Sequence, residues 1–170
     1  MLNMPQKYIG RLNFMSDIKI KEHIVEVIKA CETAFVSTIN LDNFPETRAL
    51  DNVLNRKLDN VLNRRIDDRL EIYFLGDSDS PKVEQFKKNS NASLYYYVAG
   101  SWKNMILFGK LELVTDKSLK DKLWLDDFLQ YYKNGKDDER YGIFKFTPTI
   151  YKYYPYEAGN LTCSPEIGSI

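Results

Sequence analysis

A serine, a proline and a lysine that follow a short apolar stretch are the clearest sign of chemistry in this sequence. Residues 70–76 read LEIYFLG, and Ser80, Pro81 and Lys82 stand four to six positions later, just before VEQFKKN. Serine is a common helix N-cap, and proline suits the first helical position. A helix N-terminus with free N–H groups and a nearby ammonium attracts anions, phosphate among them. An ordinary strand, turn and capped helix explains the same residues, so both interpretations stay open.

Other residue types that carry chemistry are sparse. His23 is the only histidine and lies within a helical pattern, which excludes a metal site built from several histidines and argues against a Ser–His triad. Cys31 and Cys163 are far apart, lack metal-ligand spacing and are interpreted as reduced thiols. We find no spaced carboxylate pair that would serve as acid and base. The sequence therefore assigns no catalytic residue and no metal ligand.

Size and charge limit the kind of protein this is. A chain of 170 residues with 44% hydrophobic and 28% charged residues is expected to form one globular domain. Its 24 basic residues balance its 24 acidic ones, so there is no electrostatic case for binding duplex nucleic acid or an anionic membrane. The start lacks a charged, then apolar, pattern, and no run reaches the length of a membrane span. We expect a cytoplasmic protein.

The elements that must position these residues are mostly short strands. An irregular arm over 1–15 and a tail over 155–170 flank a domain at 16–154. Hydrophobic periodicity and turn residues predict helices and strands within it. The helices are expected at 18–32, after Ser16 and Asp17, and at 81–88 and 117–132. The strands are expected at 34–39, 46–50, 70–75, 92–98, 105–114, 142–146 and 149–154. Gly109 within a strand suggests a bulge or a barrel bend. Tight turns between most strands favour a mainly β, antiparallel barrel over a doubly wound sheet.

A direct repeat interrupts this pattern. LDNVLNRK at 50–57 is followed by LDNVLNRR at 58–65. Eight residues is far below the period of a solenoid unit, so the repeat is interpreted as a local duplication that lengthened one connection. Its composition fits a short helix or a frayed strand. A repeat inserted in the core would disturb strand register, and we therefore expect a surface excursion.

Four stretches, taken in order, resemble a known family. They are AFVSTINLDNFPETRAL, LEIYFLGDSDSPKVEQFKKNSNASLYYYV, SWKNMILFGKLELVTDKSLKDKLW and YGIFKFTPTIYKYY. Together they resemble the pyridoxamine 5′-phosphate oxidase-like family of FMN-binding split barrels, most closely its general stress protein 26-like branch, over residues 20–154. The resemblance implies a six-stranded antiparallel split β-barrel with flanking helices. It also implies a homodimer with FMN at the interface.

The resemblance implies which residues meet the FMN phosphate. Arg48 in FPETRAL matches the family's arginine on the second strand, and Ala49 and Leu50 follow it in the same site. Ser80 and Lys82 match the serine and lysine that open the helix after the third strand. This agrees with the interpretation of the same helix start as an anion site, because two cations and a helix N-terminus suit a dianion.

The resemblance also implies which residues lie near the flavin ring. The strand containing Tyr73, Phe74 and Leu75 runs along the flavin, although the family often has a hydroxyl residue where this chain has Leu75. Asn104 falls where the family carries an amide side chain facing the cofactor. Trp102 either lies near the ring or is a core or interface tryptophan.

The expected activity is that of a flavoprotein, an FMN-dependent oxidoreductase that takes electrons from a reduced nicotinamide and passes them to an unknown small acceptor. A non-catalytic flavin-binding stress-response protein fits the same residues, and a barrel that binds a deazaflavin or haem is a third possibility. True pyridoxamine phosphate oxidases hold their substrate with a C-terminal arginine and histidine. The chain has neither after Arg140, which argues against vitamin B6 oxidation.

Overall fold

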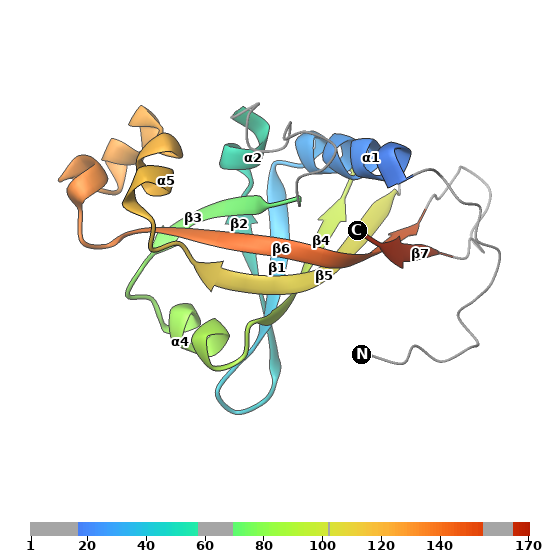
Figure 1. Ribbon diagram of the computed structural model, residues 1–170, viewed down its shortest axis with the longest axis horizontal. Coiled ribbons are helices and arrows are strands. Elements are labelled where there is room, and N and C mark those ends of the chain that lie inside the picture. The colour runs from blue at the N-terminus through green and yellow to red at the C-terminus, as the bar shows by residue number, and fades with distance from the viewer. Residues whose placement is uncertain (1–16, 58–69, 102, 155–164) are drawn as a thin grey trace.

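The structure, a computed structural model, describes residues 17–57, 70–101, 103–154 and 165–170. All the strands among these residues belong to one antiparallel sheet that curls into a half-barrel (Figure 1). Its strand order is β2-β1-β4-β5-β6-β3. The strands are β1 (Thr33–Ile39), β2 (Pro45–Asp51), β3 (Ile72–Asp77), β4 (Asn91–Tyr97), β5 (Asn104–Leu113) and β6 (Tyr141–Tyr154). The predicted mainly β fold with six antiparallel strands is confirmed.

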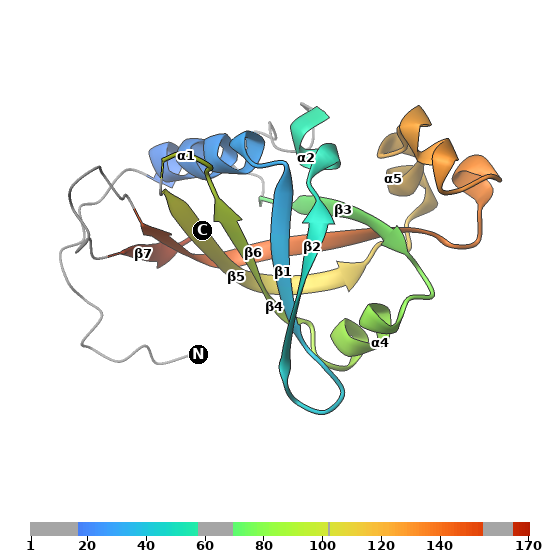
Figure 2. The same cartoon turned by 180° about the vertical axis from the view of Figure 1, so that it is seen from behind.

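Short helices cover this sheet. They are α1 (Asp17–Ala30), α2 (Val53–Lys57), α4 (Pro81–Lys88) and α5 (Lys117–Lys122), with 3-10 turns η2 (Asp126–Gln130) and η3 (Gly135–Asp137). Viewed from either side, α1 and α4 lie at opposite ends of the half-barrel (Figure 2). Both pack into the same buried cluster as the inward residues of the strands. The two helices therefore close the half-barrel and hold α4 next to the inner face of the sheet.

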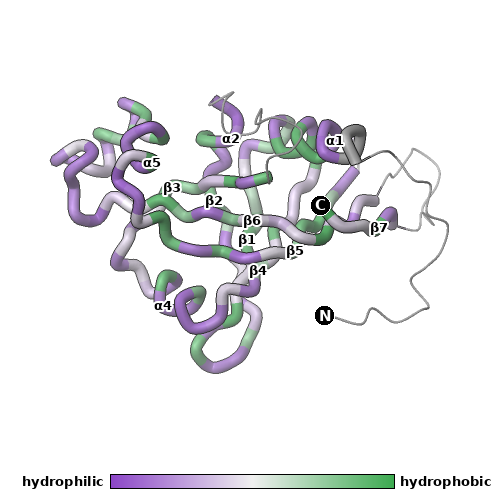
Figure 3. The backbone as a smooth tube through the Cα atoms, viewed as in Figure 1, coloured by the Kyte–Doolittle hydropathy of each residue, from purple (hydrophilic) through white to green (hydrophobic). Residues whose placement is uncertain are grey.

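The core follows from the alternation of side chains along the strands. Figure 3 shows both apolar and polar stretches along the sheet. The burial of side chains alternates, and β1 buries every second residue. A second cluster gathers aromatic residues where β3 and β6 meet the segment between α5 and η3. This second cluster fixes the helical segment that stands beside the end of β3.

β6 is a single strand, so the prediction of two strands around Pro148 was wrong. Pro148 pairs with Gly109 of β5, and the register shifts between Phe108 and Gly109. Proline has no N–H to give to a ladder and is tolerated where a bulge already interrupts the pairing. The bulge or bend predicted at Gly109 is thus found as a register shift, and the extra residue is Thr149 of β6, next to Pro148.

The prediction of one long helix at 117–132 was also wrong. α5 ends at Lys122, and a 3-10 turn follows after a short break. The break lets Trp124, Phe128 and Tyr132 all place their rings around Tyr141, with centroid distances of 5.1, 6.5 and 5.4 Å. Aromatic packing of this kind stabilises the bend more than a continued helix would, because a straight helix presents only one face.

The first copy of the repeat is structural, which corrects the expected surface excursion for residues 50–57. Asn52, Leu54 and Asn55 are fully buried, and α2 begins at Val53. Asn52 donates from Nδ2 to the carbonyls of Ile28 and Cys31 at 2.7 and 2.8 Å. The copy therefore ties the end of β2 to α1. The second copy, 58–65, lies outside the described residues.

The end of the chain adds to the sheet. Residues 166–169, for which the sequence predicted no element, form β7 (Glu166–Ser169), which pairs with β6. Four residues are too few to show periodicity, and the strand exists because β6 offers it a free edge. The arm at 1–15 and residues 155–164 lie outside the part of the chain that the structure describes.

Candidate functional site

A cleft lies beside β3, where the sheet ends. It has a volume of about 700 Å³. β3 contributes Leu75 and Gly76, α4 contributes Lys82, and residues in and after η2 close the far side. Clefts of this size are typical of sites for cofactors and small molecules. Lys82 and Leu75, both predicted site residues, thus share one cleft.

The backbone of β3 is open toward this side. β3 is the last strand of the sheet and pairs only with β6 among the described strands. Tyr73 turns its N–H and C=O away from β6, to the side-chain amide of Asn55 at 2.9 and 2.8 Å. Backbone groups two residues apart point to the same side of an antiparallel strand. Leu75 therefore presents its N–H and C=O toward the cleft, where a ligand can hydrogen-bond to them.

Lys82 brings a cation to the cleft. Its side chain is half-buried, with Nζ 5.4 Å from the centroid of the Phe144 ring. Burial lowers the pKa of Lys82, the charge of Arg48 lowers it further, and Asp77 opposes both. No ion pair joins Lys82 to a carboxylate within the described ranges. A partly desolvated ammonium that lacks such a partner favours binding of an anion.

Ser80 occupies the N-cap position of α4, but its side chain does not cap the helix. Its hydroxyl donates instead to the carbonyl of Asp77 at 2.7 Å. The prediction of a side-chain cap was therefore wrong, whereas Pro81 does stand at the first helical position as predicted. Because phosphate oxygens accept hydrogen bonds, Ser80 would serve a phosphate only after its hydroxyl turned away from Asp77.

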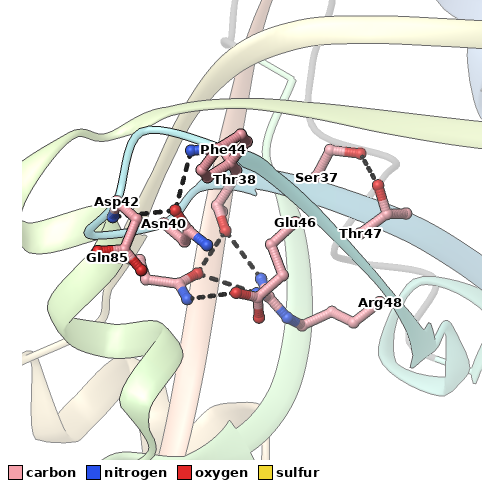
Figure 4. A network of polar contacts seen from close by, with 9 residues as sticks. All are labelled: Ser37, Thr38, Asn40, Asp42, Phe44, Glu46, Thr47, Arg48 and Gln85. Carbon is pink, nitrogen blue, oxygen red and sulfur yellow. Dashed lines mark hydrogen bonds and ion pairs between the residues drawn. The ribbon is translucent and has the colours of Figure 1, made fainter.

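Arg48 lies on the inner face of β2 within a network of polar groups (Figure 4). Its Nη1 donates to Thr38 Oγ1 at 2.9 Å, and its Nη2 donates to Gln85 Oε1 at 2.9 Å. Nη2 also pairs with Glu46 Oε1 at 2.5 Å. Hydrogen bonds from Arg48 and then Gln85 lower the pKa of Glu46, so this carboxylate is ionised at neutral pH. The predicted phosphate arginine therefore already has an anionic partner.

The other predicted residues of β2 and β3 take different positions. Leu50 packs against the core, and exposed Ala49 lies on the opposite face of β2 from Arg48. The side chains of Tyr73 and Phe74 are buried in two different clusters. Neither ring can contact a ligand in the cleft, so β3 can serve one mainly through its backbone.

Asn104 does not join this site within one chain. It opens β5 and precedes Met105, which is fully buried, so Asn104 lies on the outer face of the sheet while Arg48 lies on the inner face. β1 and β4 separate β5 from β2, a distance along the sheet of about 14 Å at normal strand spacing. Trp102 lies outside the described residues.

Sequence reasoning missed the residues that hold Arg48. Glu46 stands two residues before it on one strand, and strand periodicity alone places both on one face. Thr38 and Gln85 come from β1 and α4 and carry no signal in the sequence. A further contact was also missed at the mouth of the cleft, where Asp77 accepts from Arg140 Nη2 at 3.0 Å and from the Tyr132 hydroxyl at 3.2 Å.

Two structural features bear on the class of protein. Across the described ranges, histidine, cysteine and acidic side chains form no group of three or more that would hold a metal ion. None of the helices described here is both long and apolar enough to cross a membrane.

Comparison with known proteins points to one group. A family model described as pyridoxamine 5′-phosphate oxidase like matches residues 19–167. None of the curated proteins matches the sequence. Among solved structures, a Clostridium acetobutylicum protein related to general stress protein 26 is 20% identical, with a TM-score of 0.70 over 92% of this chain and 97% of that one.

Two further solved structures have the same fold. General stress protein 26 of Bacillus anthracis is 18% identical, with a TM-score of 0.64 over 89% of this chain and 98% of that one. The general stress FMN/FAD binding protein of Xanthomonas citri is 16% identical, with a TM-score of 0.64 over 85% of this chain and 94% of that one. At these identities the likeness shows the fold alone.

Proposed function

The chain belongs to the pyridoxamine 5′-phosphate oxidase-like family, and from that premise we propose that it binds FMN and uses it as an oxidoreductase, taking electrons from a reduced nicotinamide. The binding half of the proposal is supported by the similar proteins whose names include FMN binding. The electron donor and the small acceptor follow from what flavins do in general.

The observation that carries the proposal is Lys82 in the cleft beside β3. An ammonium that burial has partly desolvated stands at the N-terminus of α4, and Leu75 directs backbone groups into the same space. One end of the cleft therefore suits a phosphate, and its wall suits the polar edge of a planar ring. This combination fits a phosphorylated flavin better than an unphosphorylated ligand.

Different residues would bind the phosphate, orient the ring and limit access of water. Lys82 would hold the phosphate, together with Arg48, which donates to Gln85 three residues further along α4. The Leu75 backbone would orient the ring, and Phe128 and Tyr131, which line the far side of the cleft, would limit access of water to it. FMN, when bound, supplies reversible uptake of electrons and a hydride. No side chain is assigned a catalytic role, and vitamin B6 oxidation is not proposed.

The absorption spectrum of the purified protein, before and after addition of FMN, tests this proposal. Bands of oxidised flavin that stay with the protein through gel filtration are expected. Oxidation of NADH or NADPH by the loaded protein, with a dye as acceptor, then tests the activity. Retained flavin without turnover would favour the non-catalytic stress-response protein instead. A haem-type band, or no retained flavin at all, would overturn the proposal.

We also propose that the protein is a homodimer that forms through the outer face of its sheet. Phe35 and Phe108 are each 40% exposed there. The register places Tyr95 beside Phe35 and Ile106 beside Tyr95, so the apolar residues are contiguous. Obligate interfaces resemble a core cut in two. Asn104 lies on this face as well, so only the Asn104 of a second copy could reach a flavin bound by Lys82.

Phe108→Glu is expected to convert the dimer to a monomer at micromolar concentration, because burying an unpaired carboxylate at the interface is strongly unfavourable. Sedimentation velocity with FMN present measures this. Leu129→Glu is the matched control, since Leu129 is 48% exposed on η2, away from the outer face. A wild-type protein that sediments as a monomer would rule out the dimer, and equal effects of both changes would rule out this face.

A further inference from the structure

The carboxylate of Glu46 forms an ion pair with Arg48, the arginine that is proposed to bind the phosphate. Glu46 and Arg48 are two residues apart on β2 and point to the same side (Figure 4). Glu46 Oε1 pairs with Arg48 Nη2 at 2.5 Å, and its Oε2 accepts from Gln85 Nε2 at 2.9 Å. Both carboxylate oxygens are thus engaged, and the guanidinium is held on the side that faces α4.

Neutral groups hold Arg48 in place, so that only Glu46 offsets its charge within the described network. Thr38 and Gln85 are 1% and 7% exposed, and both accept hydrogen bonds from the guanidinium. Thr38 in turn donates to Gln85 Oε1 at 2.8 Å. The side chain of Arg48 is 18% exposed and that of Glu46 is 47% exposed. Buried Thr38 and Gln85 therefore fix the position of Arg48. Glu46 is more exposed, so it is the side chain that can move.

A phosphate bound at Lys82 would interact electrostatically with both Arg48 and Glu46. Arg48 donates to Gln85, which lies three residues after Lys82 on α4, and side chains at that spacing are neighbours on one helix face. The two cations therefore lie beside the same face of α4, in agreement with the lowering of the Lys82 pKa by Arg48. A dianion that approaches Arg48 also meets the carboxylate of Glu46, which repels it and competes for the Nη2 donor. Binding the phosphate to Arg48 therefore requires Glu46 to give up part of its contact.

We propose that Glu46 sets the affinity of the phosphate site by competing with the FMN phosphate for Arg48. This inference rests on the proposed function and adds a specificity-determining residue to it. Glu46 acts on the phosphate and not on the ring, so it reduces the advantage that FMN has over riboflavin. Removing its charge should restore that advantage.

Glu46→Gln is the sharpest test, because glutamine keeps the shape and one oxygen that accepts from Arg48 while losing the charge. Its NH2 group replaces the oxygen that accepts from Gln85 Nε2, so that one contact is lost as well. FMN is expected to bind about fivefold more tightly, the size typical of one partly exposed charge contact. Riboflavin affinity is expected to stay the same. Quenching of flavin fluorescence on titration with protein gives both dissociation constants, and thermal melting verifies that the variant is folded.

Glu84→Gln is the matched control. It removes the same charge from the neighbouring helix α4, where Glu84 pairs with Lys87 and not with Arg48. Little change in FMN affinity is expected for it. The inference is overturned if wild type binds FMN and Glu46→Gln does not tighten it, if riboflavin tightens equally, or if Glu84→Gln has the same effect. Failure of the wild-type protein to bind either flavin would instead overturn the proposed function, and the inference with it.

Discussion

Lys82→Ala is expected to weaken FMN binding about 10- to 100-fold and to leave riboflavin binding almost unchanged. A charge-assisted contact contributes about 1.5–3 kcal/mol, and about 1.4 kcal/mol corresponds to a factor of ten in affinity. Lys82 is half-buried and forms no ion pair with a carboxylate of the described residues, although Asp77 in the same cleft raises its pKa. Its interaction with a phosphate is therefore weakened little by solvent, and Asp77 is the carboxylate that opposes it.

Titrating FMN and riboflavin against each variant measures the effect. Lys87→Ala is the control, because Lys87 lies on the same helix, is 57% exposed and pairs with Glu84. Arg48→Ala is expected to lose FMN affinity in the same range, but it also strips hydrogen bonds from buried Thr38 and Gln85, so Lys82 gives the cleaner measurement. Equal losses for both flavins would mean that Lys82 acts on the fold or the ring. No loss would remove it from the site.

Asn55→Ala is expected to lower the free energy of unfolding by about 3 kcal/mol or more. Asn55 is fully buried. Its side-chain oxygen accepts a hydrogen bond from the N–H of Tyr73 at 2.9 Å, and its NH2 group donates to the carbonyl of Tyr73 at 2.8 Å. Alanine would leave both backbone groups unpaired where water cannot reach them, and would open a cavity beside β3. Chemical denaturation, followed by fluorescence, measures the loss.

The repeat offers a matched control for this variant. Asn63 occupies in the second copy the position that Asn55 has in the first. Since the bonds to Tyr73 come from Asn55, Asn63→Ala is expected to leave the unfolding midpoint unchanged. A loss at Asn63 and none at Asn55 would mean that the second copy holds β3, contrary to our interpretation. The same experiment tests whether the edge of β3 depends on the duplicated segment.

The sequence by itself determined the elements whose signals are local. Alternation identified β3, runs of strand-forming residues identified β1, β4 and β5, and the Ser-Pro pair marked the start of α4 at the correct residue. The ordered family resemblance indicated the antiparallel barrel, and Lys82 and Leu75 were assigned to one site before any contact was known. The strand and helix signals depend on residues close together in the chain, whereas the barrel and the assignment of Lys82 and Leu75 to one site are what the family resemblance implies.

Only the tertiary structure decided what depends on contacts between distant segments. Pro148 remains inside β6 because the ladder to β5 is interrupted next to it, where Thr149 has no partner between the pairs Phe108–Ile150 and Gly109–Pro148. Asn55 is buried because its side chain pairs with the backbone of Tyr73 on β3, although the sequence of the repeat predicted a surface insertion. The position of the Arg48 guanidinium depends on a hydrogen bond to Gln85, 37 positions along the chain. Burial and hydrogen bonding are properties of neighbours in space, and the sequence orders residues only along the chain.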